Sequence, residues 1–188
     1  MMLATSQSTL AHTLSELAAA HTAAHKLLLD TLAQSLPEPT ALLALLPEAL
    51  HEGSPDAYCR HLLYADPQGA YSLMFLVWRP GQHSPVHGHQ RWCAYKVLSG
   101  DLQEEFYSWD EATSTARYCG SATRRPGDVI KAAPGLQQIH RLGNPVTAIR
   151  PAISLHIYGV DQAHIQTGIN LVIPPENVML KSADRQTH

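Results

Sequence analysis

The sequence predicts a mainly β protein, a sandwich or barrel of short strands preceded by a helical segment. From Ala57 onward, short runs rich in β-branched and aromatic residues alternate with turn signals such as Asp66-Pro67-Gln68-Gly69 and Arg125-Pro126-Gly127-Asp128. The N-terminal residues repeat apolar side chains at helical spacing instead. Eight or so strands at this spacing indicate a sheet structure whose interior can hold a ligand.

Residues 8–35 are predicted to form the helix. Their apolar positions follow alternating steps of four and three residues, which places them on one stripe: Leu10, Leu14, Leu17, His21, Ala24 and Leu28. Pro37 and Pro39 end this helix, and Thr40 is expected to cap a short leucine-rich second one. We therefore expect residues 1–50 to pack on a β domain of residues 51–188, the two forming a single structural unit.

The predicted strands follow in order along the β domain. They are Ala57–Tyr64, Tyr71–Trp78, Trp92–Ser99, Leu102–Trp109, Thr115–Cys119, Asp128–Lys131, Ile139–Leu142 and Ala148–Tyr158. The last stretch, from Val172 to His188, contains Pro174-Pro175 and a polar end. It is expected to wrap the surface or fray.

Composition and charge narrow the class of protein. The chain has 188 residues, 45% hydrophobic and 15% charged, with a net charge of −3. This argues against a nucleic-acid or membrane surface, and no apolar stretch approaches the ~20 residues needed to span a bilayer. The N-terminus lacks the features of a signal peptide. Three cysteines suggest a reducing compartment rather than a disulfide framework, so we expect a cytoplasmic protein.

The stretch Gly81–Gly100 contains His87 and His89, two residues apart. On a β-strand such residues project to the same side, so the two imidazoles would point at one spot. Imidazole suits zinc, copper, iron and nickel, and a third ligand from elsewhere would complete a transition-metal site. The alternative is a hairpin with two solvated histidines.

A polar row marks the last predicted strand. Ser154, His156 and Tyr158 alternate with apolar residues, of which Ile149, Ile153, Leu155 and Ile157 lie on the other face. Facing the interior of a small barrel, this row would line a reaction chamber; facing water, it would be an ordinary polar surface. Tyr58 and Arg60 share one face of the first strand, where a guanidinium could grip a carboxylate bidentately.

These residues resemble a known superfamily. Gly81, His87, His89, Cys93 and Gly100 reproduce the spacing of the first cupin motif, with Cys93 where most cupins carry a glutamate ligand. Pro126-Gly127, Pro134-Gly135, His140 and Asn144 resemble the second motif. The resemblance implies a cupin β-barrel or jelly roll.

Within the cupins, the chain is most similar to the cysteine dioxygenase family of thiol dioxygenases. The resemblance implies a mononuclear ferrous ion held by His87, His89 and His140, with O2 as co-substrate. It matches Arg60 and Tyr58 to substrate binding, and Ser154, His156 and Tyr158 to the catalytic row. The expected activity is oxidation of L-cysteine to cysteine sulfinic acid by a monomer or weak homo-oligomer.

The chain departs from the family pattern at two positions. The family often has His-Asp-His where this chain has Gly88 between its histidines. Eukaryotic members carry one more residue between the second histidine and the cysteine than the three seen here. Measured back from Gly100, however, Cys93 falls on the cysteine that those enzymes crosslink to the active-site tyrosine, whereas many bacterial relatives have glycine there. A thioether between Cys93 and Tyr158 is therefore a hypothesis, and a small buried cysteine is the alternative.

Three other functions remain open on the sequence. A dioxygenase of the same family acting on 3-mercaptopropionate tends to carry glutamine in place of Arg60 and glycine in place of Cys93. A cupin that binds a metal or small ligand without turnover does not require the row Ser154, His156 and Tyr158. A zinc or manganese isomerase cupin usually keeps the glutamate that Cys93 replaces.

Overall fold

The computed structural model describes residues 2–165 and 167–173, with only the backbone for residues 2–7. The chain divides into two compact units, residues 1–36 and 37–188. Helix α1 (Met2–Ser35) accounts for the first and confirms the predicted helix, which begins earlier than residue 8. The arrangement of residues 1–50 on the β domain stays a prediction. In the described part of the chain, no helix combines the length and the apolar character that crossing a membrane requires.

The second unit begins with two short helical pieces, α2 (Pro39–Leu43) and η1 (Glu48–Leu50). The prediction that Thr40 caps α2 is wrong: Glu38 is the N-cap and makes no side-chain cap bond. Pro39 opens the helix instead, because its fixed φ suits the first helical position. Leu42 and Leu46 are buried, and Lys96 on strand β4 donates from Nζ to the Pro37 carbonyl at 2.8 Å. This leucine-rich segment therefore covers the outer face of a sheet.

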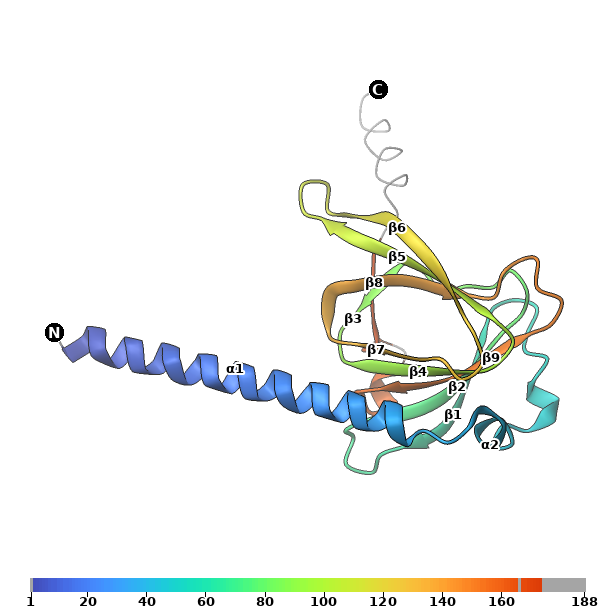
Figure 1. Ribbon diagram of the computed structural model, residues 1–188, viewed down its shortest axis with the longest axis horizontal. Coiled ribbons are helices and arrows are strands. Elements are labelled where there is room, and N and C mark those ends of the chain that lie inside the picture. Colours follow the sequence, from blue (N-terminus) through green and yellow to red (C-terminus); the bar gives the residue numbers. More distant parts are fainter. Residues whose placement is uncertain (1, 166, 174–188) are drawn as a thin grey trace, which may run out of the picture. The chain divides into compact units, whose positions relative to one another are not determined.

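Two antiparallel sheets form the β domain, and they lie face to face (Figure 1). The first has the order β1-β2-β9-β4-β7, with strands Cys59–Ala65, Ser72–Trp78, Ala152–Tyr158, Cys93–Ser99 and Val129–Ala132. The second has the order β10-β3-β8-β5-β6, with strands Asn170–Val172, His87–His89, Gly135–Gly143, Leu102–Asp110 and Thr115–Arg124. The mainly β prediction is confirmed, as a jelly roll of two sheets rather than one closed barrel. A last helical turn, η2 (Gln162–His164), precedes β10.

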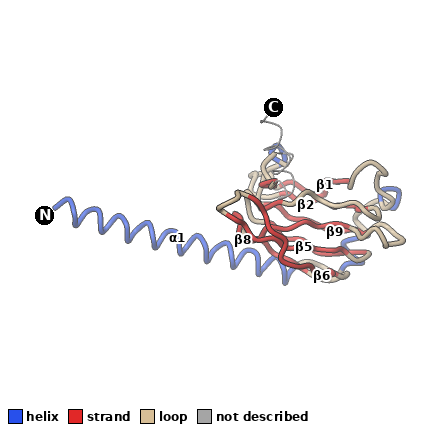
Figure 2. Tube along the Cα trace, turned by 90° about the horizontal axis from the view of Figure 1, so that it is seen from above, coloured by secondary structure: helices blue, strands red, loops and turns tan. Residues whose placement is uncertain are grey.

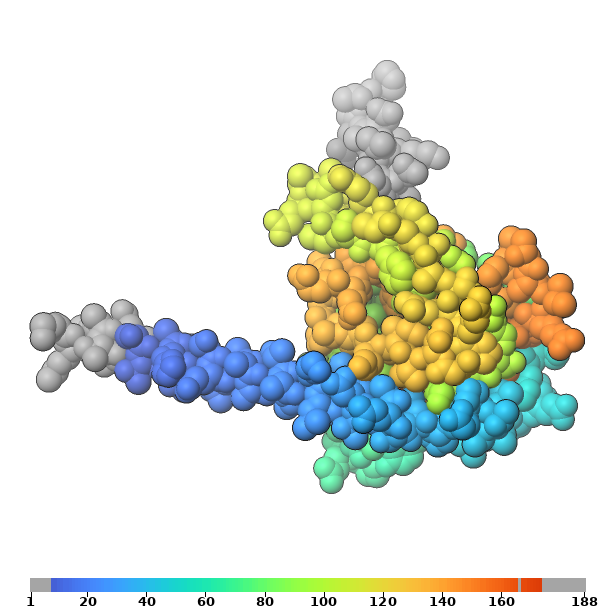
Figure 3. All heavy atoms as spheres, viewed as in Figure 1, coloured from blue at the N-terminus to red at the C-terminus, as the bar shows by residue number. Residues whose placement is uncertain are grey.

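The core lies between the two sheets. Buried side chains of β2, β4 and β9 meet Leu102 of β5 and Leu142 of β8 in one apolar cluster. Strand β9 is buried along its whole length and pairs with both β2 and β4. Figure 2 shows β9 beside β2. Strand β9 is the central strand of its sheet, so its position is fixed by hydrogen bonds to a neighbouring strand on each side. The hairpin of β5 and β6 projects beyond the other strands (Figure 3).

Eight of the strands match predicted strands, with shifted ends. The strand predicted from Ala148 begins only at Ala152, because Pro151 cannot donate to a ladder and favours a strand's first position or edge. Ile149, expected on the apolar face, is 90% exposed outside the strand. Strand β10 pairs Val172 with His87, so the first residue of the predicted C-terminal wrap lies in a sheet. The remainder of that stretch, from residue 174, lies outside the described residues.

Candidate metal centre

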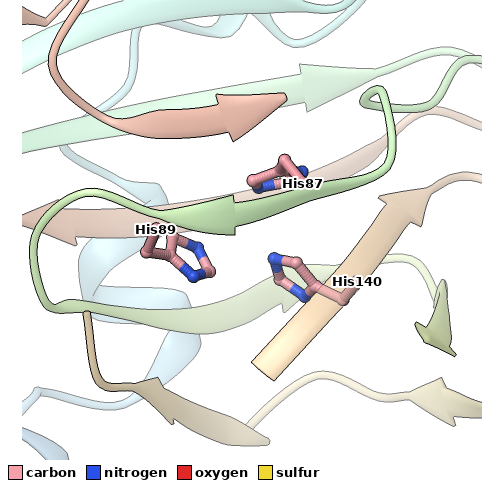
Figure 4. Close-up of side chains that lie close together, drawn as sticks. All are labelled: His87, His89 and His140. Atoms are coloured by element: carbon pink, nitrogen blue, oxygen red, sulfur yellow. The ribbon is translucent and has the colours of Figure 1, made fainter. Parts of the chain in front are cut away.

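Three histidines from two neighbouring strands converge between the sheets. His87 and His89 lie on β3, and His140 on β8 is the cross-strand partner of His87. One ring nitrogen from each residue lies within 4.8 Å of the other two. Figure 4 shows the rings of His89 and His140 turned toward each other from adjacent strands. The sequence spacing and the strand register thus bring the three predicted metal ligands together.

All three imidazoles are buried, and their hydrogen bonds suit metal ligation. Burial, followed by the nearby His140, lowers the pKa of His87 and of His89 to about 3, so both rings are neutral at neutral pH. The Nδ1 atoms of His87 and His140 contact the Pro85 carbonyl at 2.9 Å and Glu104 Oε1 at 2.6 Å, which leaves each Nε2 free. A metal needs such an uncharged nitrogen with an available lone pair.

The environment of the third imidazole, that of His89, also suits metal ligation. Its Nδ1 is buried without a hydrogen-bond partner among the described residues, while its Nε2 lies 3.3 Å from Cys93 Sγ. A buried polar atom without a partner is costly and fits a site built to hold a further group. The donor set of three imidazoles suits a transition metal rather than calcium or magnesium, which prefer oxygen ligands.

Close packing against the neighbouring strand explains the glycine at position 88, between the two histidines. A Cβ at this position would lie 2.7 Å from the Gly135 carbonyl oxygen on β8 and 3.1 Å from Leu136. The two backbones therefore approach more closely here than a residue with a side chain allows. The close approach lies beside His89, the cross-strand partner of Gly135, rather than at the pair His87 and His140.

The polar row of β9 faces the same cavity as the histidines. Its members form a continuous chain of hydrogen bonds: Ser154 Oγ lies 2.9 Å from His156 Nε2, and His156 Nδ1 lies 2.9 Å from the Tyr158 hydroxyl. Trp78 Nε1 donates to Ser154 Oγ at 3.0 Å. Burial lowers the pKa of His156 and raises that of Tyr158, so both groups are uncharged at neutral pH. The row is thus buried inside the fold, not solvated.

Arg60 closes the cavity from the edge strand β1. Its Nη2 donates to the Tyr58 hydroxyl at 2.8 Å, and Tyr58 stacks on Trp78 with ring centroids 4.3 Å apart. The cavity has a volume of about 20 Å³ and brings together the three histidines, Arg60, Tyr58, Cys93, His156 and Tyr158. Most of the residues predicted for the site therefore line one small cavity, and Ser154 adjoins it through His156.

Cys93 lies directly beside Tyr158. The two residues are cross-strand partners in the ladder of β4 and β9, and both are buried. Burial, followed by the charge of Glu104, raises the pKa of the Cys93 thiol to about 12. Cβ atoms of directly opposite residues lie about 4.5–5.5 Å apart in such ladders, close enough for the two side chains to meet. Cys59 and Cys119 are also free but lie away from this space.

Three residues of the site were not predicted from the sequence: Glu104, Arg124 and Trp78. Glu104 accepts from His140, and Arg124 Nε donates to Glu104 Oε2 at 2.7 Å. A second cavity of about 190 Å³, lined in part by Glu104 and Arg124, borders His89 and His140 from the other side. The signal for Glu104 was present: it shares a strand face with Leu102 and Phe106, where a carboxylate is out of place.

The sequence of this chain is similar to a known protein family and to several of its members. Residues 50–166 match the family model "Cysteine dioxygenase type I". Cysteine dioxygenase type 1 of Rattus norvegicus is 31% identical over 91 residues, which cover 48% of this chain and 45% of that protein. The Danio rerio protein of the same name is 31% identical over 104 residues, 54% of this chain and 50% of its own length. The chain thus spans about half the length of the curated relatives it matches.

The chain also aligns with solved structures at low sequence identity. A cupin 2 domain-containing protein from Halorhodospira halophila is 16% identical, with a TM-score of 0.47, and the alignment covers 71% of this chain and 81% of that one. The family model spans well over half of the present chain, including the three histidines, Arg60 and the polar row of β9. The chain belongs to the cysteine dioxygenase type I family.

Proposed function

We propose that the chain is a cysteine dioxygenase, which uses dioxygen and a ferrous ion to oxidise L-cysteine to cysteine sulfinic acid. The observation that carries the proposal is the cavity between the sheets where three imidazoles meet a guanidinium and a phenol. Simple metal binding needs only the imidazoles. The guanidinium and the phenol add a grip for a carboxylate and a hydrogen-bond donor, which turnover of an amino acid requires.

The donor set favours a thiolate. Three neutral ligands leave the charge of a divalent ion uncompensated, so the site attracts a soft anion. A ferrous ion bound there would lower the thiol pKa and bring sulfur and dioxygen together for electron transfer between them. In the net reaction both oxygen atoms of O2 are added at sulfur, which converts the thiol to a sulfinic acid.

Arg60 would bind and orient the substrate carboxylate. Its planar fork pairs with a carboxylate through two parallel hydrogen bonds. Tyr58 holds the guanidinium from one side through the 2.8 Å hydrogen bond, and Tyr58 itself is fixed by stacking on the buried Trp78. The carboxylate would thus be held at a set position relative to the three histidines.

The hydrogen-bond chain of β9 determines where the Tyr158 proton points. Trp78 Nε1 can only donate, so the Ser154 hydroxyl accepts from it and has His156 Nε2 as its one described acceptor. A neutral His156 that accepts at Nε2 carries its proton on Nδ1 and donates it to the Tyr158 oxygen. The opposite direction would leave the buried Ser154 hydroxyl proton unpaired, at a cost of about 1–3 kcal/mol. Tyr158 is therefore free to donate its own proton to substrate or dioxygen.

Oxygen uptake on adding L-cysteine to the iron-loaded full chain tests the proposed function. We expect stoichiometric consumption of cysteine and O2 with cysteine sulfinic acid as product, and a higher kcat/KM for L-cysteine than for 3-mercaptopropionate. Arg60 and Cys93 support this preference because relatives that favour 3-mercaptopropionate tend to lack both. A higher kcat/KM for 3-mercaptopropionate would reassign the substrate, and no uptake with either thiol would leave a metal-binding cupin.

The proximity of Cys93 and Tyr158 supports a second prediction, that a thioether forms between them. After turnover with cysteine and O2, part of the protein should lose about 2 Da in intact mass. Forming the C–S bond removes a hydrogen from each side chain, and O2 is the oxidant that takes up the two electrons and two protons. A tryptic fragment linking the two residues would locate the bond, and the Cys93→Ser variant should show no loss. An unchanged mass after many turnovers would rule the crosslink out.

We also propose where the protein is located, what it binds and how it assembles. The three cysteines are all free, which suits a reducing compartment such as the cytoplasm. A small-molecule thiol is the expected partner, and a monomer or weak homo-oligomer stays the prediction for the assembly state.

A further inference from the structure

A charged pair lies directly behind one of the three histidines. Glu104 on β5 contacts His140 Nδ1 through Oε1 at 2.6 Å and Arg124 Nε through Oε2 at 2.7 Å. Among the described residues each carboxylate oxygen thus has one close partner, and the buried Tyr95 hydroxyl also interacts with Glu104. Glu104 is 3% exposed and Arg124 28% exposed, so the pair connects the buried histidine to the rim of the second cavity.

The strand register places this pair. Phe106 on β5 is the cross-strand partner of His140 on β8, so Glu104, two residues before Phe106, lies diagonally beside the imidazole on the same face. On the other side of β5, Arg124 ends β6 opposite Leu102, and its guanidinium lies over the Phe106 ring at 5.6 Å. The sheet, rather than a loop, therefore fixes both members of the pair.

His140 differs in this respect from the other two histidines. His87 contacts a neutral backbone carbonyl through Nδ1, and His89 Nδ1 has no hydrogen-bond partner among the described residues. Of the three, the ring that comes from β8 is the one held by a carboxylate. Such a partner fixes both the tautomer and the orientation of a metal-ligating imidazole.

We propose that Glu104 is a positioning residue that keeps the proton of His140 on Nδ1, so that Nε2 stays available to the metal. Arg124 holds the carboxylate in place and neutralises its charge. The net charge behind His140 is then zero, and the site keeps its preference for an anionic substrate. This inference rests on the proposed metal site but can be tested on the metal-free protein.

The chemistry of Arg124 makes the Glu104→Gln variant informative. Arg124 can only donate, so it takes the carboxamide oxygen and turns the amide NH2 toward His140. An NH2 group there must donate, and His140 then accepts at Nδ1 and carries its proton on Nε2. The isosteric change is thus expected to invert the tautomer and to block the nitrogen that would bind the metal.

Two measurements on the full chain test the proposal. In the metal-free protein, the 15N chemical shifts of His140 should show the Nδ1-protonated tautomer in wild type and the Nε2-protonated one in Glu104→Gln. The dissociation constant for Co2+ should rise about 10- to 100-fold in that variant, the range seen when the hydrogen-bond partner of a ligand is lost. Adding Arg124→Met to Glu104→Gln should restore the Nδ1 tautomer and part of the affinity, because the amide is then free to turn.

Glu105→Gln is the matched control. Glu105 is the next residue on β5, faces the other side, and has its own ion pair with Arg141 at 3.5 Å. Its loss should leave the His140 tautomer unchanged and the Co2+ affinity within about twofold. If Glu104→Gln behaves like this control, or if the double variant binds no better than the single one, the pair only stabilises the fold and the proposal is wrong. Failure of the wild type to bind Co2+ would instead contradict the metal site, and the tautomer data would still decide the role of Glu104.

Discussion

Replacing His140 with alanine is expected to abolish iron loading and, with it, all oxygen uptake. His140 is the β8 member of the three histidines, and without it only the two imidazoles of β3 remain. Two neutral nitrogen ligands do not retain a divalent ion against water, so the loss of affinity should exceed the roughly 100-fold effect of losing a ligand's hydrogen-bond partner. The measurement is the iron content per folded chain after anaerobic reconstitution and desalting.

A histidine outside the cavity provides the control for this variant. His164 is exposed in η2 and contacts Asp161, so His164→Ala should load iron as the wild type does. Circular dichroism should show the same β signal for both variants, which separates loss of the metal from loss of the fold. Stoichiometric iron in folded His140→Ala would exclude His140 as a ligand.

Long strands with clear turn signals were predictable from the sequence, whereas the shortest strands were not. Strands β2, β4 and β5 appear close to their predicted ends because their apolar composition and flanking turns agree. Strands β3 and β10 have three residues each, too few for a period to show, and each is ordered by its neighbours. That β3 is a strand was inferred only through the spacing of His87 and His89.

The row of polar site residues on β9 could be predicted because it depends only on the alternation of side chains along one strand. Alternation along β9 puts Ser154, His156 and Tyr158 on one face whatever the fold, so the row was visible in the sequence. Glu104 was not singled out, although alternation along β5 places it on the same face as Leu102 and Phe106. Its role depends on pairing between β5 and β8, residues far apart in the chain, which a single sequence does not specify.

Arg60→Ala is expected to reduce kcat/KM for L-cysteine by roughly tenfold to a hundredfold, mainly through a higher KM. A hydrogen bond to a charged group contributes about 1.5–3 kcal/mol, and the guanidinium is the cationic side chain that lines the small cavity with the three histidines. Iron content should stay at the wild-type level, because Arg60 lies on β1 and contacts Tyr58 rather than a histidine. Steady-state oxygen uptake at varied cysteine concentration measures the effect.

Comparing cysteine with a thiol that has no carboxylate shows whether Arg60→Ala loses carboxylate binding or disturbs the whole cavity. Cysteamine, a thiol with an amine but no carboxylate, should react with the wild type and Arg60→Ala at similar rates, because it cannot use the guanidinium. Arg60→Lys keeps the charge but loses the planar fork of the guanidinium. Its KM for cysteine should therefore lie between that of the wild type and that of Arg60→Ala. If KM for cysteine is unchanged in Arg60→Ala, or if cysteamine loses as much rate as cysteine, Arg60 does not bind the carboxylate, and the substrate must be held by another group in the cavity.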